Sequence, residues 1–147
     1  MNLYIERIYM ILHKELEKYR EYYNTVLQWL FLKEHDLKID DFLASHHYKK
    51  IAIYGMGDMG NCFYMEIRNS KKVEFLYSID QGFPKLYFDI PCYKLNELDG
   101  KEVPDLIVVM LPNKFDEIKM EVETVLQCDI VSITELVYKA MYQEELC

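Results

Sequence analysis

Three glycines at a spacing suited to phosphate binding are the residues of this sequence with the clearest chemistry. Gly55, Gly57 and Gly60 follow the short apolar run Ile51–Tyr54 and open a segment with helical spacing. In a strand–turn–helix unit, the first such glycine allows the tight turn and the second lets the backbone approach a pyrophosphate. The third lets helix and strand pack closely. We therefore expect a nucleotide to bind at this turn.

An acidic residue, Asp80, stands 20 residues after Gly60, at the end of the next predicted strand. In dinucleotide-binding units an acidic side chain at this place accepts hydrogen bonds from the ribose hydroxyls of the adenosine. A 2′-phosphate would meet a like charge there, so we expect NAD rather than NADP, although Lys85 is close in sequence. The alternative is that Asp80 only starts the following turn, as aspartate often does.

The predicted site combines the glycine turn, the acidic residue and the end of a later apolar strand. Its residues are Gly55, Met56, Gly57, Asp58, Met59, Gly60, Asp80, Leu111, Pro112 and Asn113. At a helix start Asp58 would gain about 0.3 to 1 kcal/mol from the dipole, but it would repel a pyrophosphate. Three interpretations stay open: NAD or another ADP-containing ligand, a nucleotide-sugar such as a UDP-sugar, or a turn that binds nothing. S-adenosylmethionine is disfavoured, because no acidic residue directly precedes Gly55.

The composition is that of one folded domain. The chain has 147 residues, of which 51% are hydrophobic, and its net charge of -8 argues against a nucleic-acid partner. No signal-peptide pattern appears, and no apolar run approaches the roughly 20 residues of a membrane span, so we expect a cytoplasmic protein with no membrane partner. The scattered cysteines predict reduced thiols and no metal site. They are Cys62, Cys92, Cys128 and Cys147.

Residues 1–47 predict a helical segment, because apolar residues recur at three- and four-residue steps without Gly or Pro. A break is expected near Asn24, since Thr25 and Gln28 resemble a capping box. A further short helix is expected at 41–45, with Asp40 as its N-cap. The many aromatic residues of this segment either pack on the chain's own domain or form the surface of a homodimer; both alternatives stay open.

From residue 48 onward, strand and helix patterns alternate. Strands are predicted at 50–54, 73–79, 90–93, 105–111 and 129–132, and helices at 59–69, 95–98, 115–127 and up to about 144, the last capped by Ser132 or Thr134. Right-handed crossovers fold this order into a parallel sheet with helices on both faces, for which we expect the strand order 3-2-1-4-5. Residues 48–147 would then form one α/β domain, with its ligand crevice between the first and fourth strands.

The run Tyr48–Gly60, preceded by Leu27–Leu30 and followed by Ser78–Asp80, resembles small bacterial Rossmann proteins of surface-polysaccharide and sugar-nucleotide metabolism. Relatives of that group include the N-terminal domains of nucleotide-sugar dehydratases and of sugar acetyltransferases. The similarity covers residues 22–138. Members resemble NAD-binding, sugar-nucleotide-binding or CoA-binding domains, so the resemblance implies a Rossmann-like fold and a nucleotide ligand.

Two departures from those enzymes bear on catalysis. Dehydratases and epimerases of the extended short-chain dehydrogenase type need a Tyr-x-x-x-Lys pair, and no tyrosine here has lysine four residues later. The sequence also covers only one mononucleotide-binding half and a closing helix. We therefore expect a binding or regulatory module. The alternatives are a nucleotide-sugar oxidoreductase or dehydratase that works with a partner, and an interaction domain with an empty site.

Overall fold

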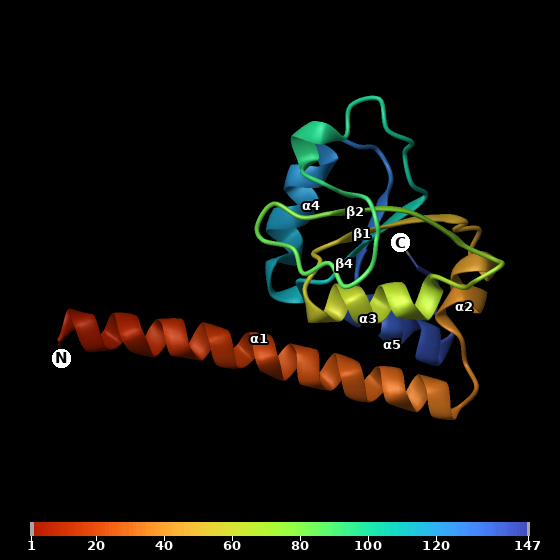
Figure 1. The fold of residues 1–147 in the computed structure, drawn as a ribbon. Coiled ribbons are helices and arrows are strands. Elements are labelled where there is room, and N and C mark those ends of the chain that lie inside the picture. The colour runs from red at the N-terminus through yellow and green to blue at the C-terminus, as the bar shows by residue number, and fades with distance from the viewer. Residues whose placement is uncertain (1, 147) are drawn as a thin grey trace.

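Five parallel strands form the centre of the molecule, in the order β3-β2-β1-β4-β5 (Figure 1). The computed structural model describes residues 2–146. The strands are β1 Lys50–Tyr54, β2 Glu74–Ile79, β3 Cys92–Tyr93, β4 Leu106–Val109 and β5 Asp129–Ser132. The predicted strand order and the α/β fold are confirmed. The point at which the strand order reverses lies between β1 and β4, which pair in parallel register.

Helices cover both faces of the sheet. They are α1 Leu3–Glu34, α2 Ile39–Ser45, α3 Asp58–Ile67, α4 Phe115–Glu123 and α5 Ile133–Tyr142, with 3-10 helices η1 Leu95–Glu97 and η2 Pro112–Lys114. One face is covered by α4 and η1, and the other by α2, α3 and α5. Helix α1 lies outside α3 and α5, on their side away from the sheet (Figure 1).

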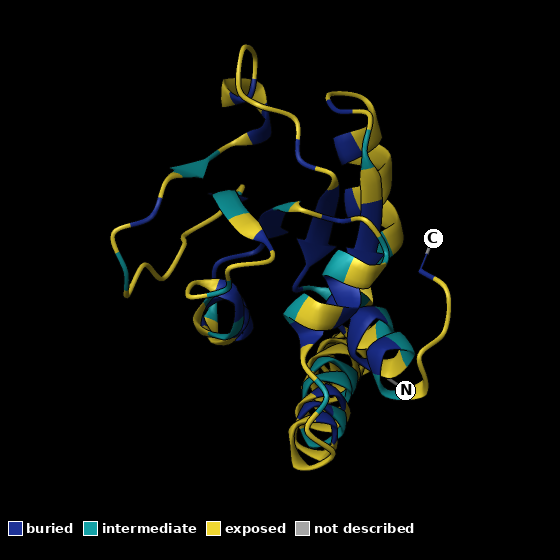
Figure 2. Cartoon of the chain, turned by 90° about the vertical axis from the view of Figure 1, so that its right-hand side faces the viewer, coloured by how far each residue is buried: buried dark blue, intermediate teal, exposed yellow. Residues whose placement is uncertain are grey.

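The sheet has two hydrophobic cores, because successive residues of each strand point to opposite faces. In β1, Ile51 and Ile53 belong to the core beneath α3 and α5, whereas Ala52 and Tyr54 belong to the core beneath α4. The central strands are therefore buried on both sides (Figure 2), which explains their almost continuous apolar sequence.

The expected break near Asn24 is wrong, because α1 is one continuous helix of 32 residues. Thr25 does not cap a second helix. It is buried, and its hydroxyl forms a hydrogen bond of 2.8 Å with the hydroxyl of Thr134 in α5. The capping-box pattern thus reflects a contact between two helices, which local spacing alone does not reveal.

Helix α1 has two halves with different surroundings. In the C-terminal half, Thr25, Trp29 and Leu32 are buried against the domain. Residues 2–16, in contrast, are all exposed, and this part of the helix extends beyond the rest of the molecule (Figure 1). The segment therefore packs on its own domain along one half only.

Two expectations about helix starts have different outcomes. Ser132 caps α5, since its hydroxyl accepts a hydrogen bond from the Glu135 N–H. Asp40 does not cap α2, whose N-cap is Lys38. The Asp40 carboxylate instead accepts hydrogen bonds from the Asp41 N–H and the Ser70 hydroxyl.

Candidate functional site

The turn after β1 has a left-handed backbone at its first glycine. Gly55 has φ of +98°, a conformation that L side chains rarely adopt, so the turn requires glycine here. Its N–H donates to the Ile79 carbonyl at 2.8 Å, and the Met110 N–H donates to the Tyr54 carbonyl at 2.8 Å. These bonds hold the turn at the carboxyl ends of β1, β2 and β4, where ligands bind in open α/β sheets.

Gly60 is required by close packing between α3 and the turn. A Cβ atom there would lie 2.2 Å from the Gly55 carbonyl oxygen, which is too short for any side chain. The absence of a side chain therefore lets α3 approach the end of β1. Gly60 therefore has the role that the motif predicts for its third glycine, the close packing of helix against strand.

Gly57 is different, because neither conformation nor packing within the described chain requires a glycine. Its φ is -100°, and a Cβ atom would have no described atom within 4 Å. Gly57 is the N-cap of α3, and among residues 2–146 no side chain caps this helix start. The start of α3 thus has open space at Gly57 and no side-chain cap, a setting that favours an anionic group.

Asp80 fastens the glycine turn to the end of β2. One carboxylate oxygen accepts the Met56 N–H at 2.8 Å, and the other accepts the Gly82 N–H at 2.8 Å. The second bond is the turn-starting interaction given as the alternative role of Asp80. Since a carboxylate has about four lone-pair sites, both oxygens still have acceptor capacity for ribose hydroxyls.

The segment after β2 folds back onto the glycine turn. The Lys85 N–H donates to the Met56 carbonyl at 2.6 Å. Asn61 of α3, which is buried, donates its amide N–H groups to the carbonyls of Lys85, at 2.7 Å, and Gly57, at 2.8 Å. Asn61 thus fixes the position of the segment, a role that the sequence did not indicate.

These elements enclose a cavity of about 340 Å³, which is in the size range of small ligand pockets. It is lined by Lys18, Tyr19, Tyr22, Gly55, Met56, Gly57, Asp58, Met59, Gly60, Asp80, Phe83, Lys85, Met110 and Leu111. The structure thus brings together eight of the ten predicted residues. The other two, Pro112 and Asn113, lie in η2, outside this lining.

Helix α1 supplies three residues of the cavity that sequence reasoning missed. The Lys18 ammonium lies 5.7 Å from the ring centre of Tyr19 and 5.9 Å from that of Tyr22, a cation–π arrangement. Burial, together with the neighbouring Tyr19 and glutamates, raises the pKa of Tyr22, so its hydroxyl keeps its proton at neutral pH. The many aromatic residues of this segment predicted a packed or paired surface, but they did not indicate that Tyr19 and Tyr22 would line the cavity at the glycine turn.

Charges of both signs lie at the rim. The Lys85 ammonium is 3.3 Å from both carboxylate oxygens of Asp58, and Lys18 is the second cation of the lining. The positive charge of Lys85 beside Asp58 offsets part of the repulsion that this carboxylate would exert on a bound diphosphate. Phe83 is fully exposed beside these charges and presents an aromatic face for a base.

Other kinds of site have less support. Within residues 2–146, no group of His, Cys, Asp or Glu is arranged to hold a metal ion. Cys62, Cys92 and Cys128 carry free thiols, and Cys147 lies outside the described residues. No helix in the described part of the chain combines the length and the apolar content of a membrane span.

Comparison of the chain with known protein families, with curated proteins and with solved structures finds no match. The candidate site therefore rests on its own geometry.

Proposed function

We propose that this chain is a Rossmann-like module that binds a nucleotide at the glycine turn, with NAD as the first candidate ligand. The observation that carries the proposal is Gly57. It leaves open space at the uncapped start of α3, although nothing in the described chain requires a glycine there. A phosphate that approaches the backbone would give this glycine its physical reason.

The arrangement of the cavity suits the parts of a dinucleotide. The pyrophosphate would lie at the start of α3, near Lys85 and Lys18, and the adenosine ribose would lie at Asp80. The Asp80 charge favours NAD over NADP. We propose a binding or regulatory role, because burial raises the pKa of Tyr22 and the chain lacks the Tyr-x-x-x-Lys pair.

A nucleotide-sugar, such as a UDP-sugar, is the second candidate ligand. Its diphosphate and ribose would use the same groups, and the cavity of about 340 Å³ is at the small end for ligand sites. A role in surface-polysaccharide or sugar-nucleotide metabolism follows from the resemblance of the glycine segment. In the enzyme alternative, the chain would act on the nucleotide-sugar with a partner as an oxidoreductase or dehydratase. The free thiols fit a reducing, cytoplasmic location.

The test is a thermal-shift and calorimetric comparison of NAD, NADP, UDP-glucose and coenzyme A. A ligand at 100 times its Kd should stabilise the wild type by about 2.7 kcal/mol. Gly57→Ala should fold normally but bind NAD at least tenfold more weakly, because the new methyl group enters the space of the phosphate. Equal affinity in the two proteins, or no stabilisation by any nucleotide, would contradict the proposal. Reduction of NAD in the presence of a nucleotide-sugar would favour the enzyme alternative.

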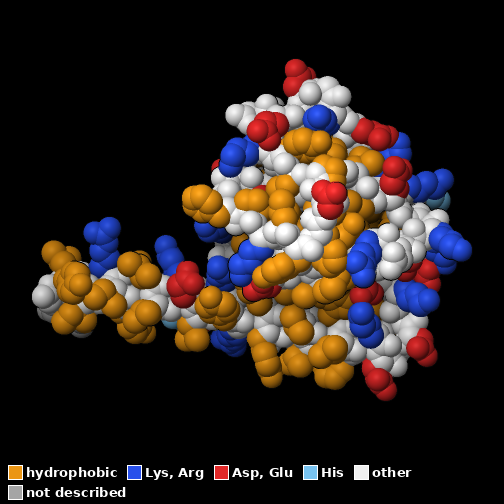
Figure 3. All heavy atoms as spheres, viewed as in Figure 1, with side chains coloured by type: hydrophobic (Ala, Val, Ile, Leu, Met, Phe, Trp, Pro, Cys, Tyr) orange, Lys and Arg blue, Asp and Glu red, His pale blue; other side chains and the backbone are white. Residues whose placement is uncertain are grey.

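We also infer that the chain forms a homodimer through α1. The exposed half of this helix carries large apolar side chains, and Figure 3 shows hydrophobic groups along the projecting helix. Their residues are Leu3, Tyr4, Ile5, Ile8, Tyr9, Met10, Ile11, Leu12 and Leu16. Continuous apolar surface of this kind marks protein interaction sites. Light scattering at micromolar concentration should give twice the mass of one chain, and a monomer would contradict the dimer.

A further inference from the structure

A heptad repeat of apolar residues runs along almost the whole of α1. Its members follow alternating steps of four and three residues, and each is between 41% and 69% exposed. They are Ile5, Tyr9, Leu12, Leu16, Tyr19, Tyr23, Val26 and Leu30. This spacing is that of a coiled-coil seam, and at 1.5 Å per residue it extends over roughly 38 Å. We call these eight residues the seam.

We propose that two copies of the chain pair their seams in antiparallel orientation, so that the N-terminal arm of one copy, Leu3–Leu16, lies in the apolar cavity beside α1 of the other. The inference rests on the homodimer proposed above. It goes further, because it fixes the direction of the pair and the place where each arm binds.

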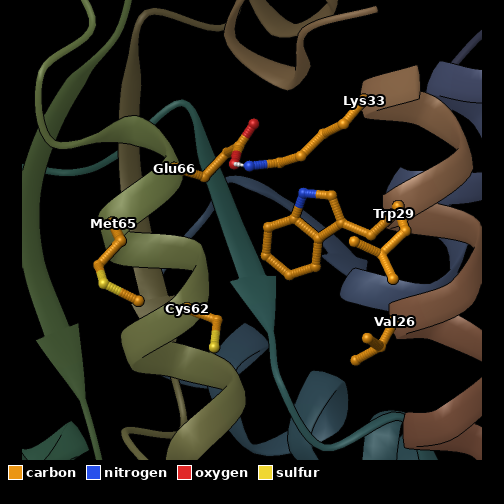
Figure 4. A pocket seen from close by; sticks show the side chains of 7 residues that line it. Val26, Trp29, Lys33, Cys62, Met65 and Glu66 are labelled. Atoms are coloured by element: carbon orange, nitrogen blue, oxygen red, sulfur yellow. Dashed lines mark ion pairs between the residues drawn. The ribbon is translucent and has the colours of Figure 1, made fainter. Parts of the chain in front are cut away.

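The cavity lies between the C-terminal half of α1 and helix α3 (Figure 4). It measures about 290 Å³ and is lined by Val26, Trp29, Leu30, Lys33, Cys62, Met65 and Glu66. Val26 and Leu30 also belong to the seam, so the seam and the cavity form one continuous surface. At one end, the Lys33 ammonium and the Glu66 carboxylate form an ion pair of 2.6 Å.

A second apolar face of the arm explains why the pair is antiparallel. Tyr4, Ile8 and Ile11 continue the line of residues that includes Trp29 and Leu32 farther along the helix. Trp29 and Leu32 pack on the chain's own domain, whereas the three residues of the arm are exposed. In an antiparallel pair, corresponding flanks of the two helices meet, so this face of the arm turns toward the partner's α3. In a parallel pair it would face away from either domain.

The length of the helix matches this arrangement. Reversal about the midpoint between Leu16 and Tyr19 brings residues 2–9 of one copy to the level of residues 26–33 of the other. Those are the levels of the α1 residues that line the cavity. Ile8 then points into the cavity lined by Met65 of the second copy. The arm is therefore long enough to cover the whole cavity.

The composition of the seam also favours the antiparallel register. Leu12 comes opposite Tyr23, Leu16 opposite Tyr19, and the first tyrosine of the seam opposite Val26. Each of these layers combines a large ring with an aliphatic side chain, and no layer holds two rings. Alternation of large and small groups packs a core well. A parallel pair in register would place each tyrosine against its own copy. Three of the eight layers would then hold two phenol groups.

Disulfide cross-linking tests the direction of the pair, in a background where the natural cysteines are replaced by serine. Leu12→Cys and Tyr23→Cys proteins should not cross-link alone on mild oxidation, but an equimolar mixture should give a covalent dimer. Cross-linking of each variant with itself would overturn the antiparallel pair while supporting the homodimer. Cross-linking in no combination, with a monomer in light scattering, would overturn both.

Alkylation of Cys62 in the wild-type chain tests whether the arm of one copy lies in the cavity of the other. Cys62 is exposed in the single chain and lines the cavity, so it should react several-fold more slowly as dimer forms with rising protein concentration. Ile8→Asp should restore fast alkylation. Met10→Asp is the matched control, because Met10 is also exposed but belongs neither to the seam nor to the second apolar face. An alkylation rate that does not change with protein concentration, or equal rates in the two variants, would overturn the placement of the arm in the cavity of the second copy.

Discussion

The three glycines of the turn have three different physical reasons. Gly55 provides a left-handed backbone, Gly60 provides room for a carbonyl oxygen, and at Gly57 a side chain would meet open space, which we propose is filled by a phosphate. Substitution at each position therefore separates folding from binding. The motif alone does not distinguish a glycine needed for backbone conformation or packing from one that leaves space for a ligand.

Gly60→Ala should destabilise the protein by on the order of 2 kcal/mol, because its Cβ would meet the Gly55 oxygen at 2.2 Å and α3 would have to move. Gly57→Ala should lose about 1 kcal/mol or less, the cost of a poorer N-cap. Urea unfolding of the two variants beside the wild type measures both losses. Equal losses would show that the space at Gly57 is not open.

Asp80→Ala should weaken NAD binding by roughly 1.5 to 3 kcal/mol, through the loss of charge-assisted hydrogen bonds to the ribose. It should also lower the melting temperature without ligand, since the amides of Met56 and Gly82 lose their acceptor. Asp80→Asn, which keeps one acceptor oxygen, should fold better and discriminate less between NAD and NADP. Calorimetry decides the matter: unchanged NAD affinity in Asp80→Ala, or tighter NADP than NAD in the wild type, would exclude Asp80 from ligand selection.

Tyr54 should make stability depend on alkaline pH. Burial, with smaller effects from Glu121 and Asp80, raises the pKa of its hydroxyl from 10.0 to about 12. Between these values the folded protein keeps a proton that the unfolded chain releases, so the free energy of unfolding should fall as the pH rises. Tyr54→Phe should reduce this fall and leave stability below pH 10 nearly unchanged. Urea unfolding from pH 8 to 12 measures it, and identical slopes would contradict the effect.

At the scale of elements, the two halves of α1 differ in what they contribute to the domain. Its C-terminal half contributes Trp29 and Leu32 to the hydrophobic core, and α2 adds Ile39, Phe42 and Leu43. Its N-terminal half contributes nothing to that core. The hydrophobic core therefore extends across the predicted boundary between the helical segment, residues 1–47, and the α/β domain, residues 48–147.

Removal of residues 2–16 should leave the domain folded, because all of these residues are exposed. A chain that begins at Tyr48 should lose its cooperative unfolding transition, since it lacks the core residues of α1 and α2. Circular dichroism during thermal unfolding distinguishes the two. Cooperative unfolding of the chain that begins at Tyr48 would show that the core does not need these helices.

At the scale of the whole molecule, the proposed dimer would couple to stability by mass action. The melting temperature of the wild type should rise by several degrees between about 1 and 100 μM protein, whereas that of the chain without residues 2–16 should stay constant. Differential scanning calorimetry at several concentrations measures this difference. A wild-type melting temperature that is independent of concentration would argue against the dimer.

The sequence by itself determined the order of strands and helices, the sheet topology and the position of the glycine turn. These features depend on local patterns: apolar runs such as Leu106–Val109, glycine spacing and right-handed crossovers. The sequence also placed Asp80 at the carboxyl end of the second strand, because that strand directly precedes it.

Only the tertiary structure decided which surfaces meet. Thr25 carries a capping pattern, yet it bonds to Thr134, which is 109 residues away, and the helix continues through it. Lys18 and Tyr22 line the cavity because α1 packs across α3 and α5, and no local spacing in residues 1–47 specifies that contact. Periodicity tells which side of a helix is apolar, but the choice of what covers that side depends on the packing of segments distant in sequence.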